Sequence, residues 1–435
     1  MATFDLLLKG GTVIDGTGAP RFQADIAIRD GKIVEIGSIS GEAAETVDAA
    51  GLIVAPGALD HHTHYDAQIF RDPTCADSGQ NGVTSVVMTN CGFGFAPCRT
   101  EHQDRYMVMM ENVEQIPVAH QRASLPWDWQ SFPEFMTSLR GTRKAVNAMV
   151  YVPMNALLIF VMGIEEAKSR PASKSELAEI KRLLNDAMDA GAIGLSCSYL
   201  GHNNVHVDFD GSAMPCDVMD LDQLVEIATV LKDRGEGVIQ CLSGLAGQDA
   251  TVEASERLAR ETGRPVFHNV IATNDDFPIH TPGLAWLDSM RAEGLDMWAA
   301  SFCHRTWAEI SLTTLTLFDS DETFRELTYA GSSAKALELL RDPEYRKRLR
   351  VAYEPEKFII VGGDLDRFIV LSVADSSEHK DVEGQLLGAA AKSLGVKTID
   401  LFADVILSSN GAAIFRSPNA TATDPDILRE LFAHE

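Results

Sequence analysis

The chain has 435 residues, of which 45% are hydrophobic, and a formal net charge of −26. This acidic excess excludes nucleic acid and anionic membrane surfaces as partners, because both would repel the chain and no basic patch compensates. No apolar run approaches the roughly 18 residues of a membrane span, and the start does not read as a signal peptide, so we expect a cytoplasmic protein that acts on a small-molecule substrate.

The first 55 residues read as short alternating strands separated by turns. Asp30 and Gly31 form a hairpin signal inside the segment ADIAIRDGKIVEIG, because a tight two-residue turn needs residues that accept a positive φ. The pattern predicts a small N-terminal β-sandwich portion over residues 1–55.

From about residue 53, apolar strands alternate with helical segments, which is typical of parallel βαβ units. Successive right-handed crossovers favour closure into a TIM-type (β/α) barrel, so residues 56–310 are predicted to form a barrel in an α/β fold. A doubly wound open sheet is the alternative, although no glycine-rich phosphate loop supports it. Seven strands are predicted, at residues 53–59, 83–89, 148–152, 192–196, 237–240, 265–269 and 295–300.

Two of the intervening helices carry clear signals. Residues 173–190 open with Ser173 and Glu176 in capping-box spacing and stop at Gly191. Residues 220–235 repeat the design, with one apolar face and a terminal glycine. After residue 305 the chain becomes helical and charged. Residues 311–435 are therefore predicted to be mostly helical, with further strands expected only in FIIVGG and DRFIVLSVA.

The segment GALDHHTHYD follows the first predicted barrel strand. His62 and His64 point to the same side of an extended chain, and barrel enzymes assemble their sites at the carboxyl ends of strands. Two neutral imidazoles placed in this way can reach one zinc ion at about 2.0 to 2.1 Å. The alternative is a solvated polar strand end.

Several segments together resemble the amidohydrolase superfamily and, within it, the D-aminoacylase group of N-acyl-D-amino-acid deacylases. They are LLLKGGTVIDG, GKIVEIG, VDAAGLIVAPGALDHHTHYD and GVTSVVMTNCGFGFAP. The resemblance implies zinc as the cofactor, as one or two ions with other divalent metals as alternatives. It also implies hydrolysis of a carbon-nitrogen bond in an amide-type small molecule such as an N-acyl-D-amino acid.

By the same resemblance, His62, His64 and Cys91 are metal ligands, and a further ligand comes from a histidine after the sixth strand, here His268. A thiolate is a soft ligand that suits zinc, although Cys91 also fits a buried apolar cysteine, one of seven scattered thiols that form no disulfide framework. His268 also fits an ordinary core histidine. The fifth strand departs from the family pattern, because VIQCLSG offers Cys241 in place of a histidine; a packed cysteine is the alternative there.

Substrate contacts are predicted in loops that follow the later strands. Solvated loop residues and surface ion pairs are the alternatives for these positions, and Met154 stands where many relatives carry a histidine. Asp66 is a candidate support for the ligand shell or a turn-stabilising aspartate. The predicted substrate residues are His202, His206, His304, Arg305 and Met154.

The resemblance further implies an aspartate at the end of an eighth barrel strand, acting as metal ligand and general base. No Ser-Asp segment stands in the right place, and LRELFAHE resembles the helix that precedes that strand, so the barrel is predicted to lack strand 8. An open barrel would expose two strand edges. A second polypeptide that completes the barrel and the sandwich is therefore predicted, which makes the chain one subunit of a split, hetero-oligomeric enzyme. The alternative is a non-catalytic or truncated amidohydrolase-like subunit.

Overall fold

The computed structural model describes residues 3–202, 204, 206–244, 250–302, 305–312, 314–358 and 362–434. The chain divides into two compact units. The first contains Met1–His61, Ala76–Val86 and Ala145–Asn147, and the second contains His62–Cys75, Val87–Lys144 and Ala148–Glu435. In the described residues, no helix is both long enough and apolar enough to cross a bilayer.

The predicted N-terminal β portion is present as one five-stranded sheet with the order β3-β2-β1-β4, in which β5 also pairs with β1. Asp30 and Gly31 both have positive φ, at 51° and 71°, which agrees with the hairpin signal between β2 and β3. The strands are β1 (Phe4–Val13), β2 (Phe22–Arg29), β3 (Lys32–Gly37), β4 (Ala43–Asp48) and β5 (Ile53–Val54).

A seven-stranded parallel sheet confirms the predicted α/β class. Its order, β12-β11-β10-β9-β8-β7-β6, follows the chain order, so each crossover adds the next strand beside the last. The strands are β6 (Ala58–Asp60), β7 (Val83–Met88), β8 (Asn147–Pro153), β9 (Gly194–Tyr199), β10 (Val238–Ser243), β11 (Val266–Asn269) and β12 (Met297–Ala299).

The first predicted barrel strand, residues 53–59, is two strands in the structure. Ile53 and Val54 form β5 and pair with β1 in the N-terminal sheet, whereas β6 begins only at Ala58. Pro56 has no amide hydrogen for a strand ladder. At Gly57, a Cβ atom would lie 2.2 Å from the Thr84 side chain, so the backbone at this point approaches β7 too closely for any other residue.

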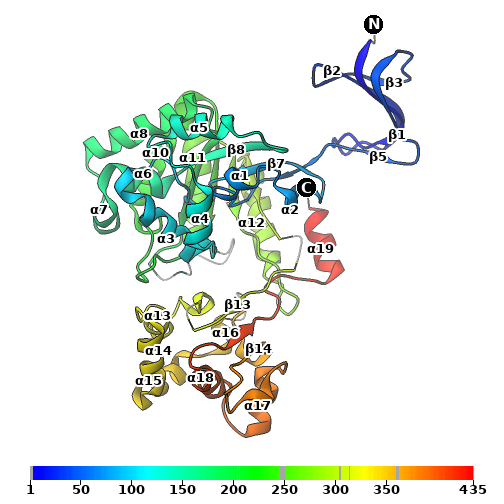
Figure 1. Ribbon diagram of the computed structural model, residues 1–435. Coiled ribbons are helices and arrows are strands. Elements are labelled where there is room, and N and C mark those ends of the chain that lie inside the picture. Colours follow the sequence, from blue (N-terminus) through cyan, green and yellow to red (C-terminus); the bar gives the residue numbers. More distant parts are fainter. Residues whose placement is uncertain are drawn as a thin grey trace. The chain divides into compact units, whose positions relative to one another are not determined.

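Helices connect the parallel strands, and α5, α8, α10 and α11 pack side by side (Figure 1). The two helices with clear sequence signals are confirmed: Ser173 and Glu176 form a capping box at the start of α8, and α10 ends at Gly235 in a left-handed conformation. The helices are α1 (Gln68–Arg71), α2 (Ala76–Gly79), α3 (Gln103–Glu114), α4 (Val118–Ser124), α5 (Phe132–Gly141), α6 (Met154–Met162), α7 (Ile164–Ser169), α8 (Lys174–Asp189), α9 (Pro215–Val218), α10 (Leu221–Arg234), α11 (Glu253–Thr262) and α12 (His280–Ala292).

The C-terminal region, residues 305–434, combines helices with a three-stranded antiparallel sheet of order β13-β15-β14. Strand β14 lies in the predicted segment DRFIVLSVA, whereas FIIVGG includes residues 359–361, which lie outside the described part of the chain. Strands β13 and β15 are two and three residues long, too short to leave a periodic sequence pattern.

Most elements of this region surround one apolar core that contains Phe318, Phe402 and Phe415. They are β13 (Glu309–Ile310), α13 (Glu322–Thr328), α14 (Ser333–Arg341), α15 (Pro343–Ala352), α16 (Pro355–Phe358), β14 (Ile369–Ser372), α17 (Leu387–Leu394), α18 (Thr398–Ser408) and β15 (Ile414–Arg416). Helix α19 (Pro425–Phe432) contributes no residue to this core (Figure 1).

Candidate metal centre

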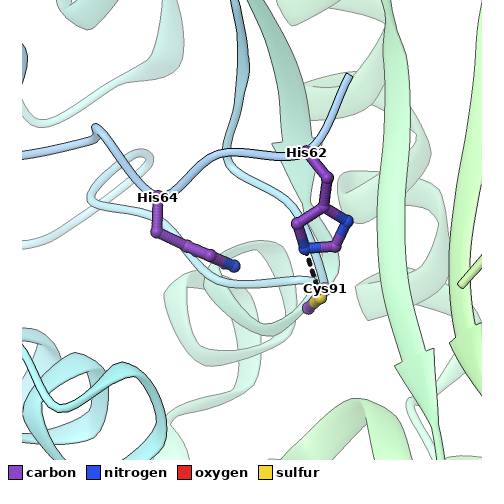
Figure 2. A group of neighbouring side chains, drawn as sticks. All are labelled: His62, His64 and Cys91. Atoms are coloured by element: carbon purple, nitrogen blue, oxygen red, sulfur yellow. Dashed lines mark hydrogen bonds between the residues drawn. The ribbon is translucent and has the colours of Figure 1, made fainter. Parts of the chain in front are cut away.

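The histidine segment that follows β6 is held by the residue between its two predicted ligands. The backbone nitrogen and Oγ1 of Thr63 both donate to the carbonyl of Val87, over 2.9 and 2.8 Å. The Asn90 amide donates to the carbonyls of Thr63 and Val87 over 3.1 and 3.0 Å. His62 and His64 flank the fixed Thr63 and extend towards Cys91 (Figure 2), which is the alternation expected of an extended chain.

Cys91 lies in a tight turn three residues beyond the end of β7. Its φ of 57° is left-handed, and its backbone nitrogen donates to Gln240 Oε1 over 2.6 Å. The next residue, Gly92, has a φ of 79°, and a Cβ atom there would come within 3.2 Å of Cys216 Sγ. The turn therefore depends on glycine and is anchored to β10, which leaves the Cys91 thiol little freedom to move.

The ligand atoms of His62, His64 and Cys91 all lie within 4.8 Å of one another, and His62 Nε2 is 3.3 Å from Cys91 Sγ (Figure 2). Bond lengths of about 2.0 to 2.3 Å in a tetrahedral zinc site place neighbouring ligand atoms about 3.3 to 3.8 Å apart. Two imidazoles and one thiol are also a donor set that zinc prefers. The distance between His62 and Cys91 and the types of the three donors therefore fit a zinc ion.

Burial has a clear electrostatic effect on this group. It raises the pKa of the Cys91 thiol well above its usual range, because the thiolate would lie in an apolar environment. A bound cation reverses this effect, since it stabilises the thiolate directly. His64 Nδ1 is buried and, in the described residues, has no hydrogen-bond partner. Both features are what a buried site built for a cation should show.

Two carboxylates lie beside the imidazoles. Glu114, the last residue of α3, has its Oε1 atom 3.3 Å from His64 Nε2. Burial raises the pKa of Asp66 to about 7, and the neighbouring His64 opposes that rise. Within the described part of the chain, no hydrogen bond of normal geometry reaches either oxygen of Asp66. Asp66 is among the residues predicted from the sequence, but Glu114 is not, because nothing in a helix end fifty residues away indicates contact with His64.

His206 lies close to the same group. Burial lowers the pKa of its ring, and Glu114 opposes that change while His64 adds to it. The ring meets Phe93 edge to face, with centroids 6.1 Å apart. The structure therefore brings His206 near the predicted ligands, whereas the other predicted histidine of this loop, His202, is exposed.

His268 occupies a different environment on β11. Its Nδ1 atom lies 3.3 Å from the Ser243 hydroxyl and 3.1 Å from the Ser255 hydroxyl, and its ring centroid is 4.8 Å from that of Trp286. Burial lowers the pKa of His268 to about 4. The group of mutually close ligand atoms found in the described residues contains neither His268 nor Cys241, which is its neighbour in the sheet.

The remaining predicted substrate residues are dispersed. Met154 is fully buried at the start of α6. Arg305 is exposed and lines a cavity in the C-terminal region. His304 lies outside the described residues.

Comparison with known proteins gives consistent matches. A model of the amidohydrolase family matches residues 45–356. D-aminoacylase of Alcaligenes xylosoxydans xylosoxydans is 32% identical over 273 residues, which cover 60% of this chain and 49% of the relative. N-acyl-D-aspartate deacylase of the same organism is 32% identical over 196 residues, 45% of this chain and 36% of the relative. The matches thus span half or less of these curated relatives.

A solved structure shares the fold. N-acyl-D-glutamate deacylase of Bordetella bronchiseptica, in complex with zinc and a phosphonate inhibitor, superposes with a TM-score of 0.62 at 21% identity. The superposition covers 99% of this chain and 74% of the deacylase chain. The predicted second polypeptide and the split enzyme are therefore wrong, because a single chain of the deacylase accounts for almost all of this fold. The prediction of a second chain depended on one missing segment, whereas the similarity of fold extends over almost the whole chain.

Proposed function

Because the chain belongs to the amidohydrolase family, and its resemblance to the D-aminoacylase group is confirmed, we propose that it is a metal-dependent hydrolase that cleaves a carbon-nitrogen bond in an N-acyl-D-amino acid or a related amide. The observation that carries this proposal is the convergence of His62, His64 and Cys91 at the ends of the first two parallel strands. Parallel-barrel enzymes place their chemistry at this end of the strands.

The proposed cofactor is zinc, held by His62, His64 and Cys91. A zinc ion in such a site supplies a Lewis acid for the scissile carbonyl and makes water a stronger acid near neutral pH. Zinc in the related N-acyl-D-glutamate deacylase supports this choice of metal. His268, which lies apart from the other three, stays a predicted ligand.

The protein groups around the three ligands have defined tasks in this proposal. The Thr63 and Asn90 hydrogen bonds fix the spacing of the two imidazoles, and the Gln240 side chain fixes the backbone of Cys91. Glu114 orients the His64 ring through its contact with Nε2, as carboxylates beside ligating histidines generally do. His206 lies where it can contact a substrate bound beside His64.

The substrate class rests on the relatives, which act on N-acylated D-amino acids by name. In the proposed reaction, water adds to the acyl carbon, the carbon-nitrogen bond breaks, and the products are a carboxylate and a free D-amino acid.

Metal analysis combined with a substrate assay tests the function. Purified wild-type protein should contain zinc and should release amine from N-acetyl-D-amino acids faster than from the L enantiomers. Cys91→Ala should lose both the zinc and the activity. Cys98→Ala removes another buried cysteine that does not belong to the three-ligand group, so it should retain both. A folded wild-type protein without zinc, or zinc that persists in both variants, would reject the proposed centre.

A further inference from the structure

A cavity of about 520 Å³ in the C-terminal region is lined by three arginines from three separate chain segments. Arg305 precedes β13, Arg367 ends the 3₁₀ helix Leu365–Arg367, and Arg416 ends β15. The volume lies within the range of about 300 to 1,000 Å³ that is usual for small-molecule sites. The size and the composition of the cavity both point to a ligand.

The backbone of two of these arginines belongs to regular secondary structure, so their positions do not depend on a bound ligand. Strand β15 is the middle strand of the antiparallel sheet, so Arg416 has Glu309 on one side and Ile369 on the other as its backbone neighbours. The helix that carries Arg367 is capped by the Asp364 side chain, which accepts a hydrogen bond from the Asp366 backbone. A site built on such elements requires little reorganisation to bind.

The charges in the cavity are not balanced. Arg367 forms an ion pair with Asp276 over 2.5 Å. Among the described residues, no ion pair or side-chain hydrogen bond is made by Arg305 or Arg416, although Glu309 neighbours Arg416 in the sheet. Arginine stays protonated at any physiological pH, so the three guanidinium groups repel one another. In a chain with a net charge of −26, this cavity is a local excess of positive charge.

The same cavity has flat and apolar walls. Trp307 is 52% exposed and lines it together with Ile369, and Asn419 adds a side-chain amide. A guanidinium group donates two parallel hydrogen bonds to one carboxylate or phosphate. Arginines from different segments therefore suit a ligand with more than one oxyanion group.

We propose that this cavity is a binding site for a small organic molecule that carries two or more oxyanion groups. None of its lining residues belongs to the proposed metal centre, so this site is additional to that centre and does not depend on the proposed function. Carboxylates and phosphates are both oxyanions that accept hydrogen bonds from arginine. The experiment below distinguishes a carboxylate ligand from a phosphate ligand.

The test is calorimetric titration of the full-length, metal-loaded protein with succinate and, separately, with inorganic phosphate at low ionic strength. At least one probe should bind. Arg305→Gln and Arg416→Gln should each weaken that binding about tenfold or more, because each removes a charge-assisted hydrogen-bonding group. Arg122→Gln removes an exposed arginine that pairs with Asp104 elsewhere, so it should leave the affinity unchanged.

Binding of succinate alone assigns the site to carboxylates, and binding of phosphate alone assigns it to phosphate esters. Absence of binding for both probes, or equal weakening in Arg122→Gln, would overturn the proposal.

Thermal unfolding without added probe checks the fold of the variants. Arg305→Gln should unfold at a temperature no lower than the wild type, since it removes a repelling charge. The probe should raise the unfolding temperature of the wild type and of Arg122→Gln more than that of Arg305→Gln. If Arg416→Gln fails to fold, the affinity of Arg305→Gln for the probe still tests the proposal, because Arg305 is exposed.

Discussion

The metal-centre end of the parallel sheet and the C-terminal region both contain buried side chains, but those side chains are polar at the first and apolar in the second. Around His62, His64 and Cys91, the buried groups are carboxylates, thiols and imidazoles, several of which have no hydrogen-bond partner in the described residues. The C-terminal core consists of stacked aromatic rings and aliphatic side chains, with rings such as Phe402 and Phe415 only 4.7 Å apart.

This difference indicates that the metal-centre residues serve function, whereas the C-terminal core residues serve stability. Burying polar groups without partners costs free energy, which a site retains only when a bound ion or substrate offsets the cost. Burying rings is favourable in itself. Substitutions in the C-terminal core should therefore change the free energy of unfolding, whereas substitutions at the metal centre should mainly change metal affinity and activity.

The largest effect on stability is expected in the C-terminal core. Phe402 is fully buried, so Phe402→Ala should lower the free energy of unfolding by about 3 to 5 kcal/mol through lost burial and a new cavity. Denaturant titration measures this value. Val351→Ala, at a side chain that is 76% exposed in the same region, should change it by less than about 0.5 kcal/mol. Similar losses in both variants would show that this core does not behave as one packed unit.

An intermediate effect is expected at the buried carboxyl of Asp319, which accepts hydrogen bonds from Thr328 and Tyr329 over 2.9 and 2.8 Å. Burial raises the pKa of Asp319 from 3.8 to about 6, so the folded chain holds this proton more tightly than the unfolded chain. The resulting stabilisation is complete below pH 3.8 and is lost as the pH rises through 6.

Asp319→Asn removes this pH dependence. The stability of the variant relative to the wild type should therefore increase between pH 4 and pH 7, by about 3 kcal/mol at most. Denaturant titrations at several pH values measure the difference, and Asp233→Asn, at an exposed position, controls for the substitution itself. A relative stability that stays constant or falls with pH would show that burial does not control the Asp319 proton.

The smallest effect is expected from a change beside the metal centre that leaves the three ligands intact. Glu114→Gln should weaken zinc binding by about tenfold to a hundredfold, because the amide orients the His64 ring less strongly than the carboxylate does. Its effect on the free energy of unfolding should be slight. Glu111→Gln, on the same helix, is the matched control. Equal zinc affinities in the two variants would show that Glu114 does not orient His64 for zinc binding.

Strands with local sequence signals were predicted well. Six of the seven parallel strands were found within three residues of their ends, because their apolar runs are bounded by turn residues. The first was misjudged, since Ile53 and Val54 form an apolar run that pairs with β1 instead. Closure of the barrel, and the absence of its eighth strand and aspartate from this chain, stay predictions.

The sequence by itself determined the parallel strands, the ends of α8 and α10, and the orientation of His62 and His64 to the same side of the chain. Each of these depends on residues within a few positions of one another. Only the tertiary structure decided that Glu114 meets His64, that His206 lies beside both, and that three distant arginines share one cavity. These contacts join residues 50 to more than 100 positions apart, and no local pattern records which distant side chains a fold will bring together.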